Sequence, residues 1–449
     1  MTQKATPPGM APAASGGCDA GLLPPPAAQA IVLAGLEAVA GTETVPLWTA
    51  LGRVAAADCR SSVALPRFDN AAVDGYGLHA EDLQSGDLES GTPAPAGRSG
   101  GAPSPAVPPR LLPVAGRVAA GAAASGPLLP GTAIRILTGA HIPDGVAAVV
   151  AEERTSRLGE AVRVAAPPPP GANIRRRGED VAPGTVVVGR GATLDARHLA
   201  IAAAAGLSRI AVRRRLRIGV LSTGDELADV GGMPGEAGIV DTNRPMLLGL
   251  LSGPAVEAVD LGILADQPDA IAAALAGAAG HLDLLVTSGG VAGSDADHLE
   301  RAILAAGGAC RTLKLALRPG KPIATGRIGA MRILALPGNP VAALVNFLLF
   351  GRPMIRRLLG TTDTASAGVP ARVAVTFRHK PGRTEFVPVK IVDRDADGTP
   401  RLDKLGRGGS ARLMPLVAAD GLAEIAAEAA DLPPGAGVSF FPFAAAFAL

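Results

Sequence analysis

The stretch "RILALPGNPVAALVNFLL", residues 332–349, joins a short apolar run to a longer apolar segment through the turn "LPGNP". The first run has the length of a buried strand. After the turn, apolar side chains recur at the spacing of one helix face: Val341, Leu344, Val345, Leu348 and Leu349. Asn339 and Pro340 stand where an N-terminal cap and a first-turn proline belong. The stretch therefore predicts a strand followed by a helix.

The same texture occurs earlier in the chain. The stretches are "LRIGVLSTGDEL" (216–227), "VEAVDLGILAD" (256–266) and "LDLLVTSGGVAG" (282–293). Each apolar run ends in small or polar residues, and a helical pattern follows it. Strand then helix, repeated, predicts a doubly wound α/β domain with a largely parallel sheet and helices on both faces.

The flanking regions have a different texture, and a chain of 449 residues is too long for a single hydrophobic core. Before the α/β domain, short apolar runs are broken by Gly and Pro, which favours a β-rich module. After it, Val373, Val375 and Phe377 alternate with period two, which favours a small barrel. We expect a multidomain α/β plus β protein with these divisions: a disordered N-terminus at 1–20, an elongated linker or N-terminal module at 21–65 and 172–215, a small β-rich domain at 66–171, the α/β domain at 216–362, and a C-terminal β-barrel at 363–449.

Composition excludes several classes of protein. The formal charge of +2 gives no basic field for nucleic acid. Three widely spaced cysteines fit neither a disulfide framework nor a zinc motif, which favours a reducing cytoplasm. No apolar run reaches the roughly 18 residues that a membrane span needs, so we expect no membrane association.

The polar ends of the predicted strands are the first candidate site. In a doubly wound sheet, ligands bind at the carboxyl ends of the strands, and here those ends carry "STGDEL", "LADQPD", "TSGGVAGSDAD" and "LPGNP". Adjacent glycines at Gly289 and Gly290 would let the backbone approach a ligand, and helix N-termini favour anions. The alternative is that these residues only close βα turns.

The stretch "KLALRPGK" is the second candidate. It contains Lys314, Arg318 and Lys321, and the chain has only six lysines. If the intervening leucines pack inward, Lys314 and Arg318 share the outer face of a strand, with Lys321 beyond the turn. That face could hold a small polyanion, although a solvated basic strand is the alternative.

Acidic side chains accompany these cations at the same predicted edge: Asp225, Glu226, Asp266, Asp295 and Asp297. Carboxylate oxygens are ligands that Mg²⁺ uses together with substrate phosphates. Acids and anion-binding groups on one rim favour phosphoryl or adenylyl chemistry with a bridging metal. The scattered histidines and the absence of a nucleophile motif give no support to acyl transfer.

A set of ordered motifs resembles one known family. The motifs are "FDNAAVDGYG", "IRILTGAHIP", "NIRRRGED", "LSTGDEL", "DTNR", "TSGGV" with a later Asp, "LRPGKP" and "LPGNPV". In this order they resemble the molybdopterin molybdotransferases, that is bacterial MoeA and the C-terminal domain of gephyrin. The likeness extends from about Gly21 to the end of the chain.

The resemblance implies a MogA-like α/β domain with β-rich N-terminal modules and a small C-terminal β-barrel. The family inserts molybdate into adenylylated molybdopterin with Mg²⁺ and releases AMP during molybdenum cofactor biosynthesis. It further implies a homodimer whose site lies between subunits, with a molybdopterin adenylyltransferase and apo-molybdoenzymes as further partners.

Matching motifs assigns roles to individual residues. The resemblance implies catalytic roles for Asp74, Thr138, Glu179, Asp180, Glu226 and Asp266. It implies that metal is held by Asp297 together with Asp266 and Glu226. It implies substrate binding by Ser288, Gly289, Gly290, Lys314, Arg318, Lys321, Pro337, Gly338, Asn339, Pro340 and Ser410. In "PRFDNAAVDGYG" (66–77), Asp69 and Asn70 are expected to fix a turn, and Tyr76, the chain's one tyrosine, to pack the loop that presents Asp74.

Several positions depart from the family pattern. Ala71 and Ala292 stand where serine is usual, Gly293 and Ser294 replace a Val-Gly pair, and Arg318 replaces a lysine. Arginine keeps the charge but presents a planar fork, which changes anion geometry. These departures leave open a catalytically weakened relative that binds or delivers molybdopterin or its cofactor. A molybdopterin adenylyltransferase also stays open, because that family shares the Ser-Gly-Gly sheet domain. The sequence leaves molybdate and tungstate equally open.

Overall fold

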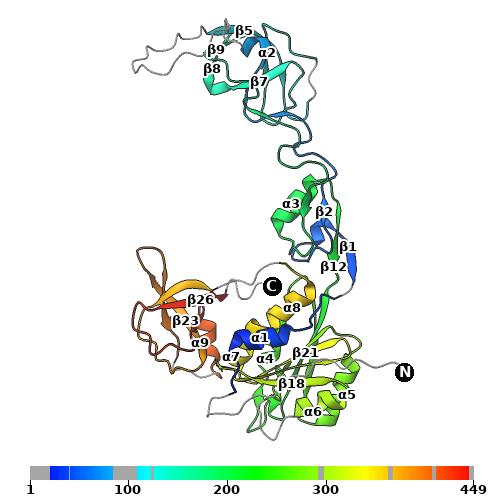
Figure 1. The fold of residues 1–449 in the computed structure, drawn as a ribbon, viewed down its shortest axis with the longest axis vertical. Coiled ribbons are helices and arrows are strands. Elements are labelled where there is room, and N and C mark those ends of the chain that lie inside the picture. The colour runs from blue at the N-terminus through cyan, green and yellow to red at the C-terminus, as the bar shows by residue number, and fades with distance from the viewer. Residues whose placement is uncertain are drawn as a thin grey trace, which may run out of the picture. The chain divides into compact units, whose positions relative to one another are not determined.

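The computed structural model describes residues 21–39, 41–83, 109–122, 126–291, 298–362, 368–406 and 411–443. The chain divides into two compact units, each discontinuous in sequence. The first takes its described residues from Met1–Ala57, Arg190–Asp195 and Ile210–Leu449, and the second from Asp58–Gly189 and Ala196–Arg209. These units partition the chain differently from the predicted divisions, whose boundaries stay a prediction. Figure 1 labels the elements of both.

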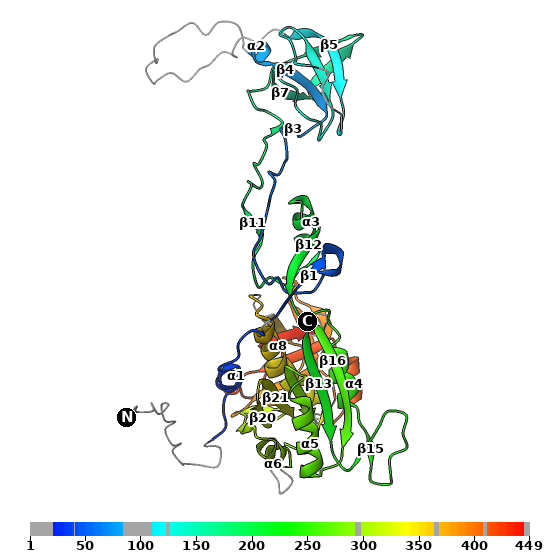
Figure 2. The same cartoon turned by 90° about the vertical axis from the view of Figure 1, so that its right-hand side faces the viewer.

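A six-stranded sheet is the centre of the first unit. Its order is β16 (Val256–Leu264), β13 (Leu216–Thr223), β17 (Leu284–Ser288), β21 (Met331–Leu336), β20 (Pro322–Ile328) and β18 (Ala309–Lys314). The first four strands are parallel, and β20 runs antiparallel to both of its neighbours. Every residue of β17 is buried, as expected for a strand that is covered on both faces. Figure 2 shows β13 and β16 side by side in this sheet.

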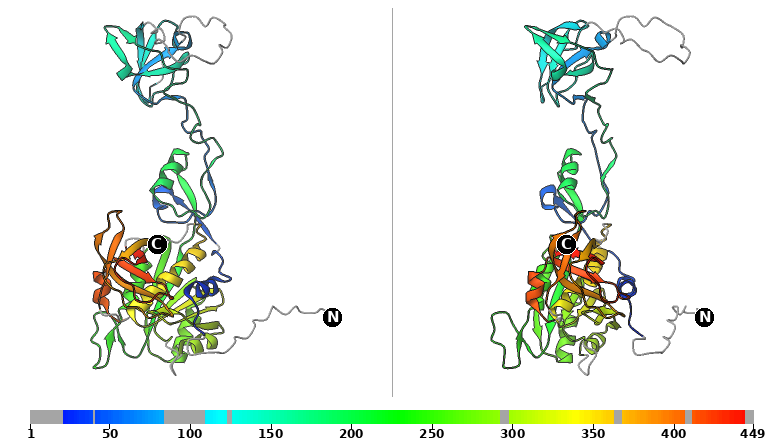
Figure 3. Two further views of the ribbon diagram at one scale, coloured as in Figure 1. Left: turned by 60° about the vertical axis from the view of Figure 1, so that its left-hand side comes forward. Right: turned by 90° about the vertical axis from the view of Figure 1, so that its left-hand side faces the viewer.

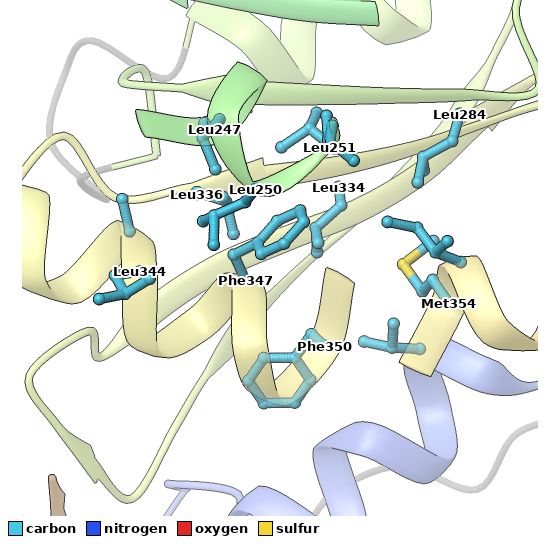
Figure 4. Packing of buried hydrophobic residues seen from close by; sticks show 14 of the residues in the cluster. Leu247, Leu250, Leu251, Leu284, Leu334, Leu336, Leu344, Phe347, Phe350 and Met354 are labelled. Atoms are coloured by element: carbon cyan, nitrogen blue, oxygen red, sulfur yellow. The ribbon is translucent and has the colours of Figure 1, made fainter. Parts of the chain in front are cut away.

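Helices cover both faces of the sheet. They are α1 (Pro25–Leu33), α4 (Asn243–Leu250), α5 (Pro268–Ala278), α6 (His298–Ala305), α7 (Pro340–Asn346) and α8 (Arg352–Leu359). Alternate strand residues enter two separate cores: Val286 packs with α1, α4, α7 and α8, while its neighbour Leu285 packs with α5 and α6. Figure 4 shows Phe347 close to Leu250 and Leu334 in the first of these cores. The predicted doubly wound α/β domain is confirmed.

The helix predicted after "LPGNP" is present but not uniform. It begins at Pro340, passes through a π-helical turn (η3, Phe347–Gly351) and continues as α8. All of α7 after Pro340 is buried, so its apolar surface is wider than one face. The predicted side-chain cap is wrong: Asn339 occupies the cap position, but its side chain is exposed and makes no cap hydrogen bond. The Asn339 carbonyl instead accepts the Ala343 N–H at 2.8 Å.

The C-terminal part of the first unit is a closed barrel. Strands β23 (Thr384–Arg394), β24 (Pro400–Lys404), β22 (Val369–Val373), β26 (Gly437–Pro442) and β25 (Gly421–Ile425) pair in that order, and β25 pairs back to β23. The short strand β19 (Leu317–Arg318) pairs with β23, and α9 (Leu413–Ala418) follows β24 in the chain. The barrel is confirmed and is visible in Figure 3. The period-two reading was wrong at Val375, which is exposed, because β22 already ends at Val373.

Smaller elements complete the first unit. Strand β1 (Thr42–Pro46) pairs with β12 (Arg209–Arg213), and the 3₁₀ turn η1 (Leu47–Thr49) follows β1. Another pair, β14 (Leu227–Ala228) with β15 (Ile239–Val240), is parallel and brackets a loop.

The second unit is β-rich, as predicted. Its main sheet has the order β7 (Val146–Ala151), β4 (Gly75–His79), β6 (Ala133–Ile136), β5 (Arg110–Val118), β9 (Ala161–Val164) and β8 (Thr155–Leu158). Short pairs form between β2 (Cys59–Arg60) and β11 (Val186–Val188), and between β3 (Asn70–Ala71) and β10 (Ile174–Arg175). Helices α2 (Ala80–Leu83) and α3 (Ala196–Ala204) and the turn η2 (Glu152–Arg154) complete it. Across both units, none of the described helices has the length and apolar character needed to span a bilayer.

Candidate functional site

The carboxyl ends of the parallel strands are level with one another. Ser288 pairs with Ser222 on one side and with Leu336 on the other, so the segments that follow β13, β17 and β21 begin at one edge. The Gly289 N–H donates to the Leu336 carbonyl at 3.1 Å, and the Gly224 N–H donates to the Leu264 carbonyl at 3.2 Å. The structure thus brings the predicted strand-end segments together.

The glycines at this edge are required by the backbone. Gly289 has a φ of +96°, and a Cβ there would lie 2.2 Å from the Thr223 carbonyl oxygen. Gly290 has a φ of +69°, and its Cβ would lie 3.1 Å from Thr223 Oγ1. A side chain at Gly289 would therefore displace one strand end from the next, and glycine keeps this edge compact.

Asn243 joins two of these strand ends and was absent from the predicted site residues. It is the first residue of α4 and is buried. Its Nδ2 donates to Ser288 Oγ at 2.6 Å and to the Gly338 carbonyl at 2.7 Å. The sequence signal was present in the motif "DTNR", but nothing in the local pattern indicates which distant groups Asn243 would contact.

Acidic groups gather beside the ends of β13 and β16. The Asp266 N–H donates to Asp225 Oδ1 at 3.0 Å, and Asp266 Oδ1 is buried without a hydrogen-bond partner in the part of the chain that the structure describes. Burial raises the pKa of Asp266, the carboxylates of Asp225 and Glu226 raise it further, and His298 opposes them. Desolvation and like charge together disfavour the ionised form, so a cation would relieve both.

The predicted metal ligands are only partly assembled. Within the described ranges, no group of three or more His, Cys, Asp or Glu side chains could hold a metal ion. Asp297 falls in the gap between residues 291 and 298, outside the described residues, as do Ala292, Gly293, Ser294 and Asp295. Ser410 also lies outside them. Asp266 and Glu226 are close enough to interact, and the orphaned Asp266 oxygen fits a cation ligand.

The basic stretch alternates as predicted. Leu313, Leu315 and Leu317 are buried, whereas Lys314 and Lys321 are exposed and the Arg318 side chain is about half exposed. The strand is not continuous: β18 ends at Lys314, and β19 begins at Leu317.

A cavity of about 560 Å³ lies between the α/β domain and the barrel of the first unit. Arg318 lies on its wall, together with cations from the barrel that the sequence analysis did not identify: Arg378, Lys404 and Arg412. These residues are far apart in the chain, and arginine is abundant in this sequence, so no local pattern distinguished them. The cavity combines an excess of positive charge with room for a small anion.

Glu385 is a buried acidic residue among the cations that line this cavity. Strand pairing places it directly opposite Arg318. Its carboxylate contacts Arg318 Nη1 at 3.8 Å, Lys404 Nζ at 3.4 Å and His379 Nδ1 at 2.9 Å. One carboxylate therefore fixes two of the cavity's cations.

In the second unit, Asp74 and Thr138 form a direct pair. Asp74 Oδ1 accepts the Thr138 hydroxyl at 2.6 Å and the Thr138 N–H at 2.7 Å, and these hydrogen bonds lower the pKa of the exposed Asp74 carboxyl. Tyr76 is buried, as expected for a residue that packs this loop, and Arg135 lies over its ring at 5.1 Å. Asp74 is thus presented ionised at the surface.

The arginine-rich motif folds into a local turn. Glu179 accepts the Arg176 N–H at 2.7 Å and Arg175 Nε at 3.0 Å, and these two bonds lower its pKa. Asp69 ties the motif to the neighbouring loop, because it accepts the Arg177 N–H at 2.8 Å and Arg176 Nη1 at 2.7 Å. Asp180 is exposed beside this turn. The roles proposed for Glu179 and Asp180 stay predictions.

One departure from the family pattern has a structural setting. Ala71 is only 1% exposed and packs in the core of the second unit. The position is therefore part of the protein interior and not of the exposed surface around Asp74.

Comparison with known proteins matches the whole length of this architecture. Family models match at residues 23–206 (MoeA N-terminal region, domain I and II), 219–357 (probable molybdopterin binding domain) and 370–443 (MoeA C-terminal region, domain IV). A Haemophilus influenzae protein named molybdopterin molybdenumtransferase is 37% identical, with 71% of this chain and 73% of that protein covered.

Two further proteins agree. Molybdopterin molybdenumtransferase 2 of Mycobacterium tuberculosis H37Rv is 35% identical over 87% of this chain and 93% of its own length. The crystal structure of the molybdopterin biosynthesis moeA protein of Pyrococcus horikoshii OT3 has a TM-score of 0.74 at 28% identity, covering 94% of this chain and 100% of that one. The predicted family and fold class are confirmed, and the chain belongs to the molybdopterin molybdenumtransferase family.

Proposed function

We propose that this protein is a transferase of molybdenum cofactor biosynthesis that inserts molybdate into adenylylated molybdopterin, with Mg²⁺ and with release of AMP. The observation that carries the proposal is the convergence of Ser288, Gly289 and Gly338 at the edge of the α/β sheet. Glycine backbone that a ligand can approach closely and a helix N-terminus at such an edge favour a phosphate group. Membership of the family names the phosphate-bearing substrate.

We place the second substrate in the cationic cavity. Arg378 is paired with Asp431 at 2.5 Å, but Arg318, Lys404 and Arg412 still exceed the single carboxylate of Glu385 in charge, so a small dianion such as molybdate is favoured there. The guanidinium group of Arg318 offers two parallel N–H donors to an oxyanion, where the family's lysine offers a point charge.

The acidic cluster has the donor set that Mg²⁺ prefers. Asp266 and Glu226, joined by Asp297, would hold the ion, and the bound ion would neutralise charge on the substrate phosphates. The raised pKa of Asp266 and its unpartnered oxygen support this assignment. Without the ion, these carboxylates would repel the same phosphates.

Asp74 and Thr138 would complete the site, and we propose that they do so in a homodimer in the cytoplasm. Asp74 is exposed, ionised and held in one orientation by Thr138, as a residue that contacts substrate or metal should be. Both of these hydrogen bonds go to Oδ1, and among the described residues none is made by the second carboxylate oxygen.

The test is incubation of the purified full-length chain with adenylylated molybdopterin, Mg²⁺ and either molybdate or tungstate. We expect AMP release together with a product that activates an apo-molybdoenzyme. Asp74→Ala should abolish release, whereas Glu81→Ala, an exposed carboxylate of the same unit, should leave it unchanged.

Two results would redirect the proposal. Binding of the nucleotide without AMP release would favour a binding or delivery protein, which Arg318 in place of the family's lysine motivates. Formation of adenylylated molybdopterin from ATP would favour an adenylyltransferase. Absence of both binding and turnover would refute the proposal.

A further inference from the structure

Asn243 holds the ends of two strands with one amide group. Its Nδ2 lies 2.7 Å from the Gly338 carbonyl oxygen and 2.6 Å from Ser288 Oγ. A carbonyl oxygen can only accept, so the atom facing Gly338 must be the amide nitrogen and not the amide oxygen. The orientation of the Asn243 side chain is therefore fixed by chemistry, and both of its N–H bonds are used.

This orientation determines the hydrogen-bonding role of the Ser288 hydroxyl. Because Asn243 donates to it, Ser288 Oγ is an acceptor in that bond, and its own proton must point elsewhere. Ser288 is 3% exposed, and among the described residues Asn243 is its only hydrogen-bond partner. A buried hydroxyl proton that lacks an acceptor, beside two glycines at a strand end, is poised to donate to a ligand.

A second polar group that lacks a hydrogen-bond partner among the described residues lies on the Asn243 side chain. Asn243 is 5% exposed, and its Oδ1 is buried without a partner in the described parts of the chain. The site thus has a free donor on Ser288 and a free acceptor on Asn243, joined by one hydrogen bond. A ligand that carries both anionic oxygens and N–H groups would satisfy the two together.

The backbone that carries Asn243 is held in place independently of any ligand. Asp241 Oδ1 accepts the N–H groups of Asn243 and Arg244, both at 3.1 Å. Arg244 is in turn fixed by Asp241 Oδ2 at 3.2 Å, by Asp260 Oδ2 at 2.5 Å and by Asp229. The amide of Asn243 is therefore presented at the sheet edge by an ionic network in which Arg244 and Asp241 are buried.

We propose that Asn243 is a positioning residue that makes the Ser288 hydroxyl a hydrogen-bond donor toward the anionic group of the substrate. This inference rests on the proposed function, because it takes adenylylated molybdopterin as the ligand. Asn243 acts through Ser288, so removing either residue removes the same interaction.

A double-mutant cycle tests this directly. Asn243→Ala, Ser288→Ala and the double variant are compared by the KM for adenylylated molybdopterin in the AMP-release assay. We expect each single variant to raise KM about tenfold or more with little change in kcat, and the double variant to match the single ones. Losses that multiply in the double variant would overturn the inference, because a merely structural Asn243 would act independently of Ser288.

Two measurements keep the outcome decisive. Thermal unfolding identifies a variant that fails to fold, and Asn243→Ser then replaces Asn243→Ala, since one hydroxyl cannot donate to both Gly338 and Ser288. If the wild type binds the nucleotide but releases no AMP, calorimetric Kd values replace KM, and the cycle still decides. A wild type that neither binds nor turns over refutes the proposed function itself.

Discussion

Gly289→Ala tests the claim that the strand ends are held together by a glycine that admits no side chain. An added Cβ would lie 2.2 Å from the Thr223 carbonyl, and the φ of +96° is unfavourable for alanine. A left-handed backbone costs about 1–2 kcal/mol for a non-glycine residue, and forcing the backbone apart adds about 1–3 kcal/mol. We expect a local destabilisation of about 2–5 kcal/mol.

Gly307→Ala is the matched control. Gly307 has a φ of +76° in the same domain, but a Cβ there would meet no heavy atom within 4 Å. Only the left-handed backbone cost of about 1–2 kcal/mol applies, so the difference between the two variants isolates the steric contact with Thr223.

Native-state hydrogen exchange of the peptide that contains β17 is the appropriate measurement, because a chain with two compact units need not unfold in one step. Since about 1.4 kcal/mol corresponds to a factor of ten, Gly289→Ala should speed exchange by roughly 30-fold or more. Equal effects of Gly289→Ala and Gly307→Ala would refute the close contact between the strand ends.

Three further predictions concern charge. Thr138→Val removes the hydroxyl that lowers the pKa of Asp74, so we expect this pKa, measured by NMR, to rise. In the wild type, the lowered pKa contributes stability that is complete above the unfolded pKa and is lost as pH falls through the folded pKa. An unchanged pKa in the variant would contradict the pairing of Asp74 with Thr138. Glu385→Gln removes the negative charge among the cavity's cations and should lower the KM for molybdate several-fold. A higher KM would show that Glu385 matters more for orienting Arg318 than for its charge. Asp266→Asn should raise the Mg²⁺ concentration for half-maximal AMP release about tenfold or more. The wild-type carboxyl has a raised pKa and therefore loses stability as pH rises, so the variant should also remove that loss. An unchanged Mg²⁺ requirement would exclude Asp266 as a ligand.

Much of the fold could be predicted because its signals are local. Residues 284–288 begin with an apolar run and end in Thr287 and Ser288, and such polar strand ends mark one edge by the rule for parallel sheets. The alternation of Leu313, Leu315 and Leu317 likewise fixed which side chains are buried. The same period-two reading failed at Val375, since a strand end interrupts the period without changing the composition.

The parts of the site that were missed depend on packing between distant segments. Asn243 meets Gly338 across 95 positions of sequence, and its partners follow from the placement of α4 on the sheet. Lys404 reaches the cavity only because the barrel closes and β19 joins β23. No period or motif in the sequence encodes either event.

The discontinuity of the two units has a consequence for how the chain is made. Residues 58–189 interrupt the first unit, and backbone hydrogen bonds between Ala55 and residues 191 and 192 close that interruption. Gln29 of α1 donates to the Leu349 carbonyl, 320 positions away, so the earliest part of the first unit awaits partners synthesised near the end. The inserted β-rich unit has all of its residues before position 210 and can fold during translation. Synthesis should therefore yield a folded insert flanked by unpaired segments, and a chain stalled before residue 330 would present α1 to chaperones or proteases.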